Sequence, residues 1–431
     1  MICNNITVKD NTLYFAGQDT VALAKKYGTP LYLMDEDKIR EKCRIYKHAF
    51  VKHFGPGSYP LYASKANSFK RIYEIMTEEG MGIDVVSSGE IYTAFKAGFD
   101  LSNAYFHSNN KTDEDIAFAI EHGIGYFVAD NVEEVKAVEA EAAKKGIVQK
   151  MLLRITPGID THTYEAVNTG MVDSKFGSAI ETGQASEIVD FTLRQTHIDL
   201  VGFHCHVGSQ VFAEDVFERA AVVMLEFIAD MQKEFGYTAK VLDLGGGYGV
   251  RYVDSDPYLD IEVKIGEVAA TIRTTCDRLG LEMPAIHMEP GRSIVADAGM
   301  TLYTVGTVKQ IPGYKNYVSI DGGMTDNPRF ALYGSRYTCF LANKMAETCD
   351  FECSIVGRCC ESGDIIQEHV MVPSTVGRND IVAVCTTGAY NYSMASNYNR
   401  IARPALVMLS EGKNYVAVRR ESLEDICRND I

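Results

Sequence analysis

The 431-residue sequence predicts an α/β protein in which a (β/α)8 TIM-like barrel is followed by a β-rich, sandwich-like or barrel-like domain. From about residue 30 to residue 290, short β-branched or aromatic runs alternate with amphipathic helical stretches. Eight such runs occur, which is the number of strands that a barrel requires. After residue 298 the helical periodicity gives way to strand patterns that Gly, Pro and Asn turns separate.

The first region contains eight candidate strands, each a short apolar run. They are Tyr59–Ser64, Ile83–Val86, Ala104–His107, Tyr126–Ala129, Met151–Ile155, Leu200–His206, Val241–Leu244 and Ala285–Met288. Helices are predicted between them at Phe69–Glu79, Gly89–Ala97, Asp113–Glu121, Val132–Lys144, Asp215–Phe235 and Val263–Leu279. Ser88 and Thr112 are candidate N-caps, and Gly80, Gly98 and Gly123 lie where helices should end. The regular alternation favours a closed barrel over a doubly wound open sheet.

The second region is predicted to be built from strands with few long helices. Its candidate strands are Met300–Gln310, Tyr317–Ile320, Phe351–Val356, Asp380–Cys385 and Ala405–Leu409. The opening segment Ile6–Phe15 also alternates apolar and polar residues around a turn at Asp10–Thr12, so we expect it to join this domain. The predicted domains are therefore a barrel at 30–297 and a β-rich domain formed by 1–29 and 298–431.

Composition excludes several classes of function. The charge balance is 42 − 58 = −16, which is too acidic for a general field that binds nucleic acid or an anionic membrane. The N-terminus lacks a basic start followed by an apolar core, and no run of 18 apolar residues occurs. The 11 cysteines form no CxxC pair. We therefore expect a cytoplasmic protein with reduced thiols and no nucleic-acid or membrane partner.

Polar residues lie at or near the carboxyl end of nearly every candidate strand of the barrel. In strand order they are Lys65, Asp84, His107, Arg154, the pair His204 and His206, the triplet Gly245–Gly247, and Glu289 with Arg292. Catalytic residues of barrel enzymes lie at these carboxyl ends. Folding does not require polar groups there, so their joint placement predicts an active site.

Two of these positions favour a cofactor that carries a carbonyl and a phosphate. Lys65 follows an apolar strand directly, so it is either a solvated strand end or an amine that forms a Schiff base with a carbonyl. The Gly245–Gly247 turn needs bare backbone, either for a tight turn or for a nest of N–H groups around a phosphate. Ser209 could add a hydroxyl to the same phosphate. GGGYG does not match the GxGxxG dinucleotide fingerprint.

The histidines and Glu289 favour a planar ring. His204 and His206 are two residues apart, so they face the same side of a strand. Either the two histidines bind a metal ion, or one of their rings stacks on a planar cofactor. A metal pair needs further ligands; His107 could help, but no second HxH and no HExxH occurs, so no metal is predicted. Glu289 could hold a ring nitrogen protonated, and Arg292 suits a substrate carboxylate. The alternative for both is an ion pair in a solvated loop.

These residues together resemble the alanine-racemase/ornithine-decarboxylase group of fold type III pyridoxal-phosphate enzymes, and within it the diaminopimelate decarboxylase family. The similar motifs span nearly the whole chain in order. They are YASKAN, DVVSSGE, KFG at 175–177, GFHCHVGSQ, LDLGGGYG, MEPGRSIV, DGGMTDNPRFALYG, CESGD and GAYNYSMASNYN. Arg358, Asn391 and Ile401-Ala402 depart from the family pattern, and none of them has a chemical role above.

The resemblance implies roles around pyridoxal 5'-phosphate. Lys65 would be the Schiff-base lysine and His206 would stack on the cofactor ring. Ser209, the Gly245, Gly246 and Gly247 turn, and Tyr390 would bind the phosphate. Glu289 would face the pyridine nitrogen. Asp84 and Arg154 would support the cofactor and the lysine.

The resemblance also implies a substrate and an assembly. The substrate would be meso-2,6-diaminopimelate, decarboxylated to L-lysine and CO2 in the last step of lysine biosynthesis. The substrate-binding residues would be Arg292, Arg329, Tyr333, Glu361 and Tyr390. Cys360 would be the catalytic proton donor, and Cys360 and Glu361 would come from the partner subunit of a homodimer.

Other functions compete with this hypothesis. A related decarboxylase could act on ornithine, lysine, arginine or carboxynorspermidine. The cation at Arg329 favours a distal carboxylate over the distal amine of ornithine or lysine, but it leaves carboxynorspermidine open. A racemase would need a second base, and no racemase motif occurs. A small pyridoxal-phosphate regulator would lack the C-terminal domain, and a metal-dependent barrel hydrolase lacks ligands.

Overall fold

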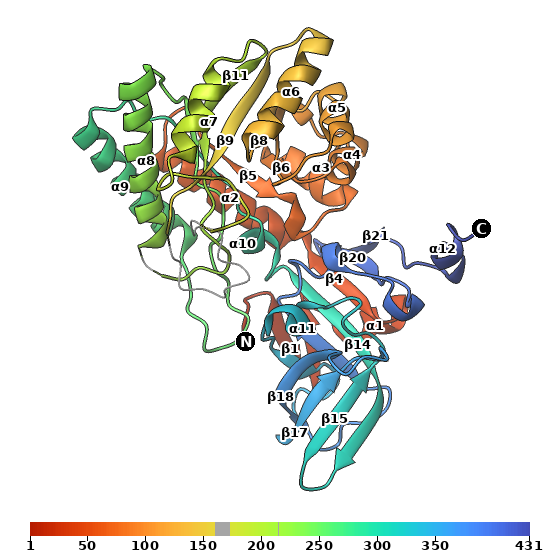
Figure 1. Cartoon of the computed structure of the whole chain (residues 1–431). Coiled ribbons are helices and arrows are strands. Elements are labelled where there is room, and N and C mark those ends of the chain that lie inside the picture. The colour runs from red at the N-terminus through yellow and green to blue at the C-terminus, as the bar shows by residue number, and fades with distance from the viewer. Residues whose placement is uncertain (160–172, 214) are drawn as a thin grey trace. The chain divides into compact units, whose positions relative to one another are not determined.

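The computed structural model describes residues 1–159, 173–213 and 215–431, and Figure 1 shows the whole chain. The chain divides into two compact units. One unit, the barrel unit, comprises Lys42–Gly249 and Leu259–Gly291. The other, the sheet unit, comprises Met1–Glu41, Val250–Tyr258 and Arg292–Ile431.

The barrel unit contains a closed parallel barrel of eight strands. They are β5 (Tyr59–Ala63), β6 (Gly82–Val85), β7 (Ala104–Phe106), β8 (Tyr126–Ala129), β9 (Gln149–Thr156), β11 (Ile198–His204), β12 (Val241–Asp243) and β13 (Ala285–Met288). Each strand pairs with the next, and β13 pairs with β5 to close the ring. The short β10 (Ser178–Ala179) adds to β9. The prediction of a barrel over an open sheet is confirmed.

Helices connect these strands, and Figure 1 shows them outside the barrel. They are α3 (Lys70–Glu79), α4 (Ser88–Lys96), α5 (Asp113–Glu121), α6 (Val132–Lys145), α7 (Gln184–Leu193), α8 (Val216–Phe235) and α9 (Ile261–Leu279). A further helix, α2 (Glu36–His53), begins in the sheet unit and precedes β5. Thr112 caps α5 as predicted, through a reciprocal capping box with Asp115. The prediction for Ser88 is wrong by one residue, because Ser87 accepts the hydrogen bond from the Glu90 N–H. The sequence patterns missed α2 and α7.

The sheet unit is built around a nine-stranded sheet. Its strands are β4 (Leu31–Asp35), β14 (Gly299–Ile311), β15 (Lys315–Ile320), β16 (Cys339–Leu341), β17 (Cys349–Val356), β18 (Ile365–Pro373), β19 (Ile381–Cys385), β20 (Ala405–Ser410) and β21 (Lys413–Val418). Short helices interrupt them: α10 (Arg292–Val295), α11 (Arg329–Tyr333) and α12 (Leu423–Cys427). β4 joins antiparallel to β14 and parallel to β20. The predicted β-rich C-terminal region is confirmed.

The N-terminal segment packs into the sheet unit. It forms β1 (Ile6–Lys9), β2 (Thr12–Phe15) and β3 (Gln18–Asp19), followed by α1 (Thr20–Tyr27). Asp10 and Asn11 turn the chain with positive φ angles, as the predicted turn requires. Ile6, Leu13 and Phe15 are buried in the same core as residues of β4, β14 and β20. Burial of these apolar side chains holds the segment to the sheet.

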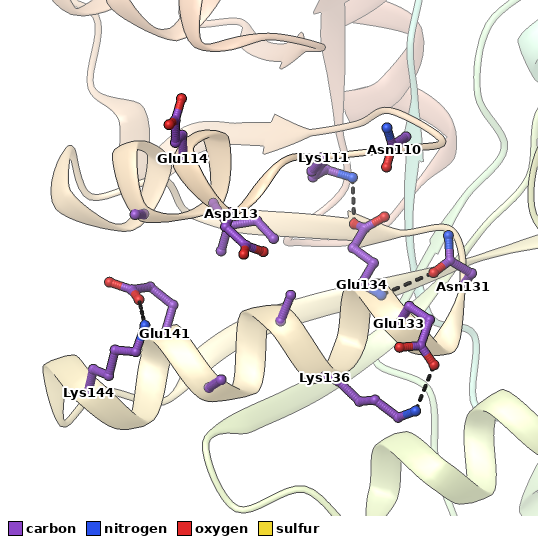
Figure 2. A pocket seen from close by; sticks show the side chains of 14 residues that line it. Asn110, Lys111, Asp113, Glu114, Asn131, Glu133, Glu134, Lys136, Glu141 and Lys144 are labelled. Atoms are coloured by element: carbon purple, nitrogen blue, oxygen red, sulfur yellow. Dashed lines mark hydrogen bonds and ion pairs between the residues drawn. The ribbon is translucent and has the colours of Figure 1, made fainter.

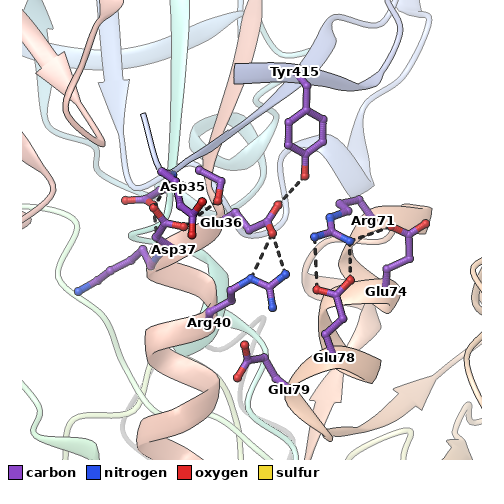
Figure 3. A network of polar contacts seen from close by, with 12 residues as sticks. Asp35, Glu36, Asp37, Arg40, Arg71, Glu74, Glu78, Glu79 and Tyr415 are labelled. Carbon is purple, nitrogen blue, oxygen red and sulfur yellow. Dashed lines mark hydrogen bonds and ion pairs between the residues drawn. The ribbon is translucent and has the colours of Figure 1, made fainter. Parts of the chain in front are cut away.

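Separate polar networks stabilise each of the two units (Figure 3). In the sheet unit, the buried Glu36 accepts hydrogen bonds from Arg40 and, at 2.5 Å, from the Tyr415 hydroxyl of β21. On α3 of the barrel unit, Arg71 pairs with Glu74 and Glu78. The residues of these networks lie outside the predicted active site, so we assign them a structural role.

Two findings bear on the environment of the protein. In the part of the chain that the structure describes, no helix has both the length and the apolar character needed to cross a membrane. No disulfide links any of the 11 cysteines, all of which are among the described residues.

Candidate active site

Lys65 lies at the mouth of the barrel, one residue past the start of a short 3-10 turn that follows β5. Its side chain is 42% exposed, and Nζ lies 4.0 Å from Oδ2 of the fully buried Asp84. Neither carboxylate oxygen of Asp84 has a hydrogen-bond partner among the described residues. Burial raises the pKa of Asp84 above its ordinary value. The pair therefore combines an accessible amine with a carboxyl group that the protein alone leaves unsatisfied.

Arg154 projects from β9 and is held by the KFG motif. Its guanidinium lies 4.4 Å from the centre of the Phe176 ring. A Cβ at Gly177, whose φ is +73°, would come within 3.0 Å of the Arg154 carbonyl oxygen, so only glycine fits there. The structure thereby explains a motif that had no role in the sequence patterns: it positions the cation of Arg154.

The glycine turn after β12 is a cradle with no room for side chains. A Cβ at Gly246 would lie 2.2 Å from the Glu289 carbonyl oxygen, and one at Gly247 would lie 2.3 Å from that of Gly208. Gly245 has φ +66°; its N–H donates to Asp243, and its carbonyl accepts from the Glu289 N–H at 2.8 Å. Close backbone approach is what a phosphate nest requires.

His206 and Ser209 follow β11 in one loop, and both are half-buried. The Gly246 N–H donates to Nδ1 of His206 at 3.3 Å, which fixes the ring beside the glycine cradle. Burial, together with the positive charges of Lys65 and Arg154, lowers the pKa of His206 well below its ordinary value. A neutral imidazole whose orientation is fixed by this hydrogen bond can stack on a planar ring.

Glu289 follows β13 and is buried between two histidines. Nε2 of His107 lies 2.6 Å from its Oε1, and Nε2 of His204 lies 3.2 Å from its Oε2. The two imidazole rings contact each other edge to face. The two histidines of this strand have different partners: the ring of His204 contacts Glu289, and the ring of His206 accepts from the Gly246 N–H.

The buried carboxyl groups of the barrel differ in charge. Burial alone would raise the pKa of Glu289, but His107 and His204 outweigh it and hold the pKa well below its ordinary value. For Asp243, burial and the neighbouring Glu289 carboxylate raise the pKa well above its ordinary value. The two histidines therefore favour the ionised form of Glu289, whereas burial works against ionisation of Asp243 and Asp84.

This arrangement fits pyridoxal phosphate. The cradle of Gly245–Gly247 would take a phosphate, and the ionised Glu289 would accept a ring N–H. Asp84 supplies buried oxygens that lack hydrogen-bond partners in the described protein. His107, His204 and Glu289 also place three ligand atoms within 4.8 Å of one another, a spacing that a metal ion could use.

In the sheet unit, Arg292 and Arg329 lie among tyrosines. Arg292 begins α10 and donates from Nη1 to the Tyr252 hydroxyl at 2.7 Å. The Tyr390 ring lies 4.8 Å from the Arg292 guanidinium and 5.4 Å from that of Arg329. Tyr333, predicted as a substrate residue, lies 5.6 Å from Arg329. The structure thus gathers four predicted residues into one cluster, the arginine–tyrosine cluster, and adds Tyr252.

Arg329 begins α11 and is only 7% exposed. Among the described residues no carboxylate lies within 4.0 Å of its guanidinium; its side-chain partner is the Ser335 hydroxyl at 3.2 Å. Burial works to lower the pKa of Arg329, but the phenols of Tyr337, Tyr252 and Tyr390 outweigh it and raise the pKa. A buried cation surrounded by phenols is a site for an anion.

Cys360 and Glu361 are exposed in a turn of the sheet unit. Asp364 fixes this turn: its carboxylate accepts the Cys359 N–H at 2.7 Å and the Met324 N–H at 2.6 Å. The CESGD segment is thereby tied to the segment that precedes Arg329. The Cys360 N–H donates in turn to the side chain of Asn399.

A separate groove of about 750 Å³ lies between α5 and α6 (Figure 2). The lysines that line it are paired with acids: Lys111 with Glu134, Lys136 with Glu133, and Lys144 with Glu141. None of the predicted site residues lines this groove.

Sequence patterns missed three kinds of site residue. Tyr252 and Tyr337 carry no motif signal, and only their contacts with Arg292 and Arg329 identify them. His107 was considered only as an extra metal ligand. Asp364 was part of a motif, but its two backbone acceptor contacts are visible only in the fold.

Comparisons with known proteins agree with this geometry. Residues 36–296 match the family described as pyridoxal-dependent decarboxylase, pyridoxal binding domain. The chain is 43% identical to the diaminopimelate decarboxylase of Bacillus subtilis, covering 97% of this chain and 95% of the relative. It is also 43% identical to that of Staphylococcus aureus, covering 99% and 100%.

A solved structure of the diaminopimelate decarboxylase of M. jannaschii, in complex with L-lysine, matches with a TM-score of 0.91 at 31% identity. The match covers 99% of this chain and 98% of that one. The cradle, the lysine and the ionised glutamate thus occur in a chain similar over its full length to these enzymes. The chain belongs to the diaminopimelate decarboxylase family of pyridoxal-dependent decarboxylases.

Proposed function

We propose that this chain decarboxylates meso-2,6-diaminopimelate to L-lysine and CO2, as the last step of lysine biosynthesis, with pyridoxal phosphate as cofactor. The observation that carries the substrate assignment is Arg329, a buried cation with phenols in place of a carboxylate partner. Such a cation favours a substrate whose distal end carries a carboxylate. Ornithine and lysine carry an amine at their distal end, so a site for either would place an acidic side chain there.

Residues of the barrel unit bind and orient the cofactor. When bound, pyridoxal phosphate supplies a carbonyl carbon that bonds to an amine and a ring that accepts an electron pair. Lys65 provides the amine that anchors it, and the ionised Glu289 accepts the ring N–H. His206 packs on the ring face, while Asp84 and Arg154 support the lysine and the ring. The Gly245–Gly247 turn, Ser209 and Tyr390 bind the phosphate.

The remaining predicted residues act on the substrate. Arg292, Arg329 and Tyr333 bind the distal carboxylate, and Glu361 binds the distal ammonium. At the reacting centre the bond between Cα and its carboxylate breaks, CO2 leaves, and Cα gains a proton. The Cys360 thiol donates that proton and is then reprotonated by solvent.

An assembly follows from the exposure of two of these residues. Cys360 and Glu361 are exposed in the single chain, although the chemistry needs a site that excludes water. We propose a homodimer with shared active sites, in which the Cys360–Glu361 turn of one subunit serves the site of the other. We place the enzyme in the cytoplasm, because its 11 cysteines form no disulfide.

One alternative has a specific observation in its favour. His107, His204 and Glu289 could hold a metal ion, as a barrel hydrolase would require. A second set of alternatives keeps the cofactor but changes the substrate to carboxynorspermidine, ornithine or lysine. The experiment below separates the three cases.

The test is a visible absorbance spectrum of the purified protein with pyridoxal phosphate, with and without meso-diaminopimelate, together with assays for CO2 and lysine. We expect a Schiff-base band and lysine formation, both abolished by Lys65→Ala. Lys70→Ala, an exposed lysine at the start of α3, serves as the control and should retain both. A band without lysine formation would indicate another decarboxylation. The absence of any band would reject the proposal and revive the metal alternative.

A further inference from the structure

Two buried histidines contact the carboxylate of Glu289 from different strands of the barrel. His107 follows β7, and His204 ends β11. Their rings are 6% and 1% exposed, and each contacts a different carboxylate oxygen. We propose that His107 and His204 are positioning residues that keep Glu289 ionised and fix its carboxylate plane, so that Glu289 can accept the N–H of the cofactor ring. This inference rests on the function proposed above.

The hydrogen-bonding capacity of the three groups supports this role. Nδ1 of His204 is buried and has no hydrogen-bond partner among the described residues. A neutral His204 therefore carries its proton on Nε2, the nitrogen that faces Glu289 at 3.2 Å. Burial lowers the pKa of His204 to about 4, so the ring is neutral near pH 7. The 2.6 Å contact of His107 with Oε1 is an ion-pair contact without hydrogen-bond geometry, whereas His204 makes a hydrogen bond to Oε2. An ionised carboxylate accepts about four hydrogen bonds, so Glu289 can accept from His204 and still take a ring N–H.

The comparison with the other buried acids explains why two histidines are needed. The titratable groups around Glu289 are His107, His204, His206, His287, Cys205, Asp84, Asp243 and Arg154. Asp243 accepts one backbone N–H, and Asp84 accepts no hydrogen bond from the described residues; burial raises the pKa of both. A buried carboxylate without donors takes up a proton. Without its imidazoles Glu289 would do the same, and a protonated carboxyl group is a poor acceptor for a pyridinium proton.

His287 offers a matched control on the same strand. It is two residues before Glu289, is 2% exposed, and has a pKa lowered by burial to about 4, like His204. Its ring nitrogens contact the Tyr105 hydroxyl and the Gly57 carbonyl oxygen, both at 3.0 Å. A change at His287 therefore removes a buried histidine of the barrel without removing a donor to Glu289.

The experiment uses the full-length holoenzyme with 15N-labelled pyridoxal phosphate and reads the NMR shift of the ring nitrogen. We expect the wild type to give the shift of a protonated ring nitrogen. His107→Leu and His204→Leu should move it toward the unprotonated value, and His204→Gln, which restores an N–H donor, should move it back. His287→Leu should lower Tm but leave the shift unchanged.

Cofactor affinity provides a second readout that does not depend on catalysis. Each leucine variant should raise the Kd of pyridoxal phosphate about tenfold, the effect of a lost charge-assisted hydrogen bond. The Kd of an analogue with C–H in place of the ring nitrogen should stay within about twofold of the wild type, because it donates nothing to Glu289.

Two outcomes would overturn the inference. One is a protonated ring nitrogen in both leucine variants with unchanged affinity. The other is binding of one Zn²⁺ per chain by the wild type that the leucine variants abolish, which would identify a metal site. If the wild type binds no pyridoxal phosphate at all, the proposed function fails first.

Discussion

The two units of this chain bury opposite charges and surround them with different groups. In the barrel unit, Glu289 stays ionised because two imidazoles contact its oxygens. In the sheet unit, Arg329 stays ionised among phenol rings and has no carboxylate partner within the described chain. Among the described residues, no lysine or arginine lies within 4.0 Å of the Glu289 carboxylate, and no carboxylate lies within 4.0 Å of the Arg329 guanidinium. A fold that only needed stability would pair such groups or replace them with apolar side chains. Each charge is therefore available to a ligand group of the opposite sign.

The first prediction removes the charge of the barrel unit. Glu289→Gln should lower kcat/KM for meso-diaminopimelate by about 10²–10³-fold, because a preorganised charge at the electron-accepting ring is lost. Steady-state kinetics of the holoenzyme measures this. Glu267→Gln, an acid of α9 that is 54% exposed, should leave kcat/KM unchanged. Equal effects of the two changes would contradict a specific role for Glu289.

The second prediction removes the charge of the sheet unit. Arg329→Met should raise KM on the order of 10²-fold with a smaller change in kcat, because a desolvated partner of a substrate carboxylate is lost. Arg336→Met is the matched control, since Arg336 is 55% exposed and seven residues away. An unchanged KM in Arg329→Met would show that the arginine–tyrosine cluster does not bind substrate.

The third prediction tests the cost of burying an acid without an opposite charge. Glu90 accepts a hydrogen bond from the Val86 N–H, and burial raises its pKa to about 7. The folded protein then binds one more proton than the unfolded chain between about pH 4.5 and 7, so stability falls as pH rises through this window.

Glu90→Gln should therefore stabilise the protein more at pH 8 than at pH 5, by about 2–3 kcal/mol in the difference. Thermal unfolding at the two pH values measures it. Glu133→Gln, on an exposed part of α6, should change the stability by the same amount at both pH values. A Glu90 variant whose gain in Tm does not depend on pH would reject the assignment.

The smallest effect is expected from the phenol that Arg292 contacts. Tyr252→Phe removes the hydroxyl that accepts a 2.7 Å hydrogen bond from Arg292 and leaves the ring in place. KM should rise about 2–10-fold, which is the change expected from the loss of one hydrogen bond. Tyr258→Phe, whose side chain is 79% exposed, should have no effect on KM. A Tyr252→Phe enzyme with unchanged KM would mean that the ring alone orients Arg292.

Sequence patterns predicted most of the barrel because its signals are local. Each of the eight strands was found within two residues of its observed bounds, since a buried parallel strand is a short apolar run. The same logic placed Lys65, Asp84 and Glu289 at the carboxyl ends of their strands, because Lys65 and Glu289 follow a strand and Asp84 lies near the end of β6. The strands β16, β18 and β21 escaped. β16 has only three residues, and polar residues interrupt the apolar pattern of the nine-residue β18 and of β21.

What the sequence by itself determined is therefore the type of fold and which chemical groups stand at strand ends. The partners of those groups were decided only by the tertiary structure. Closing the barrel brings His107, His204 and Glu289 from its third, sixth and eighth strands into contact, and no spacing along the chain encodes that meeting. Tyr252 reaches Arg292 in the same way, across 40 residues of sequence. Local spacing sets which end of a strand a residue occupies, whereas long-range packing sets which charge it faces.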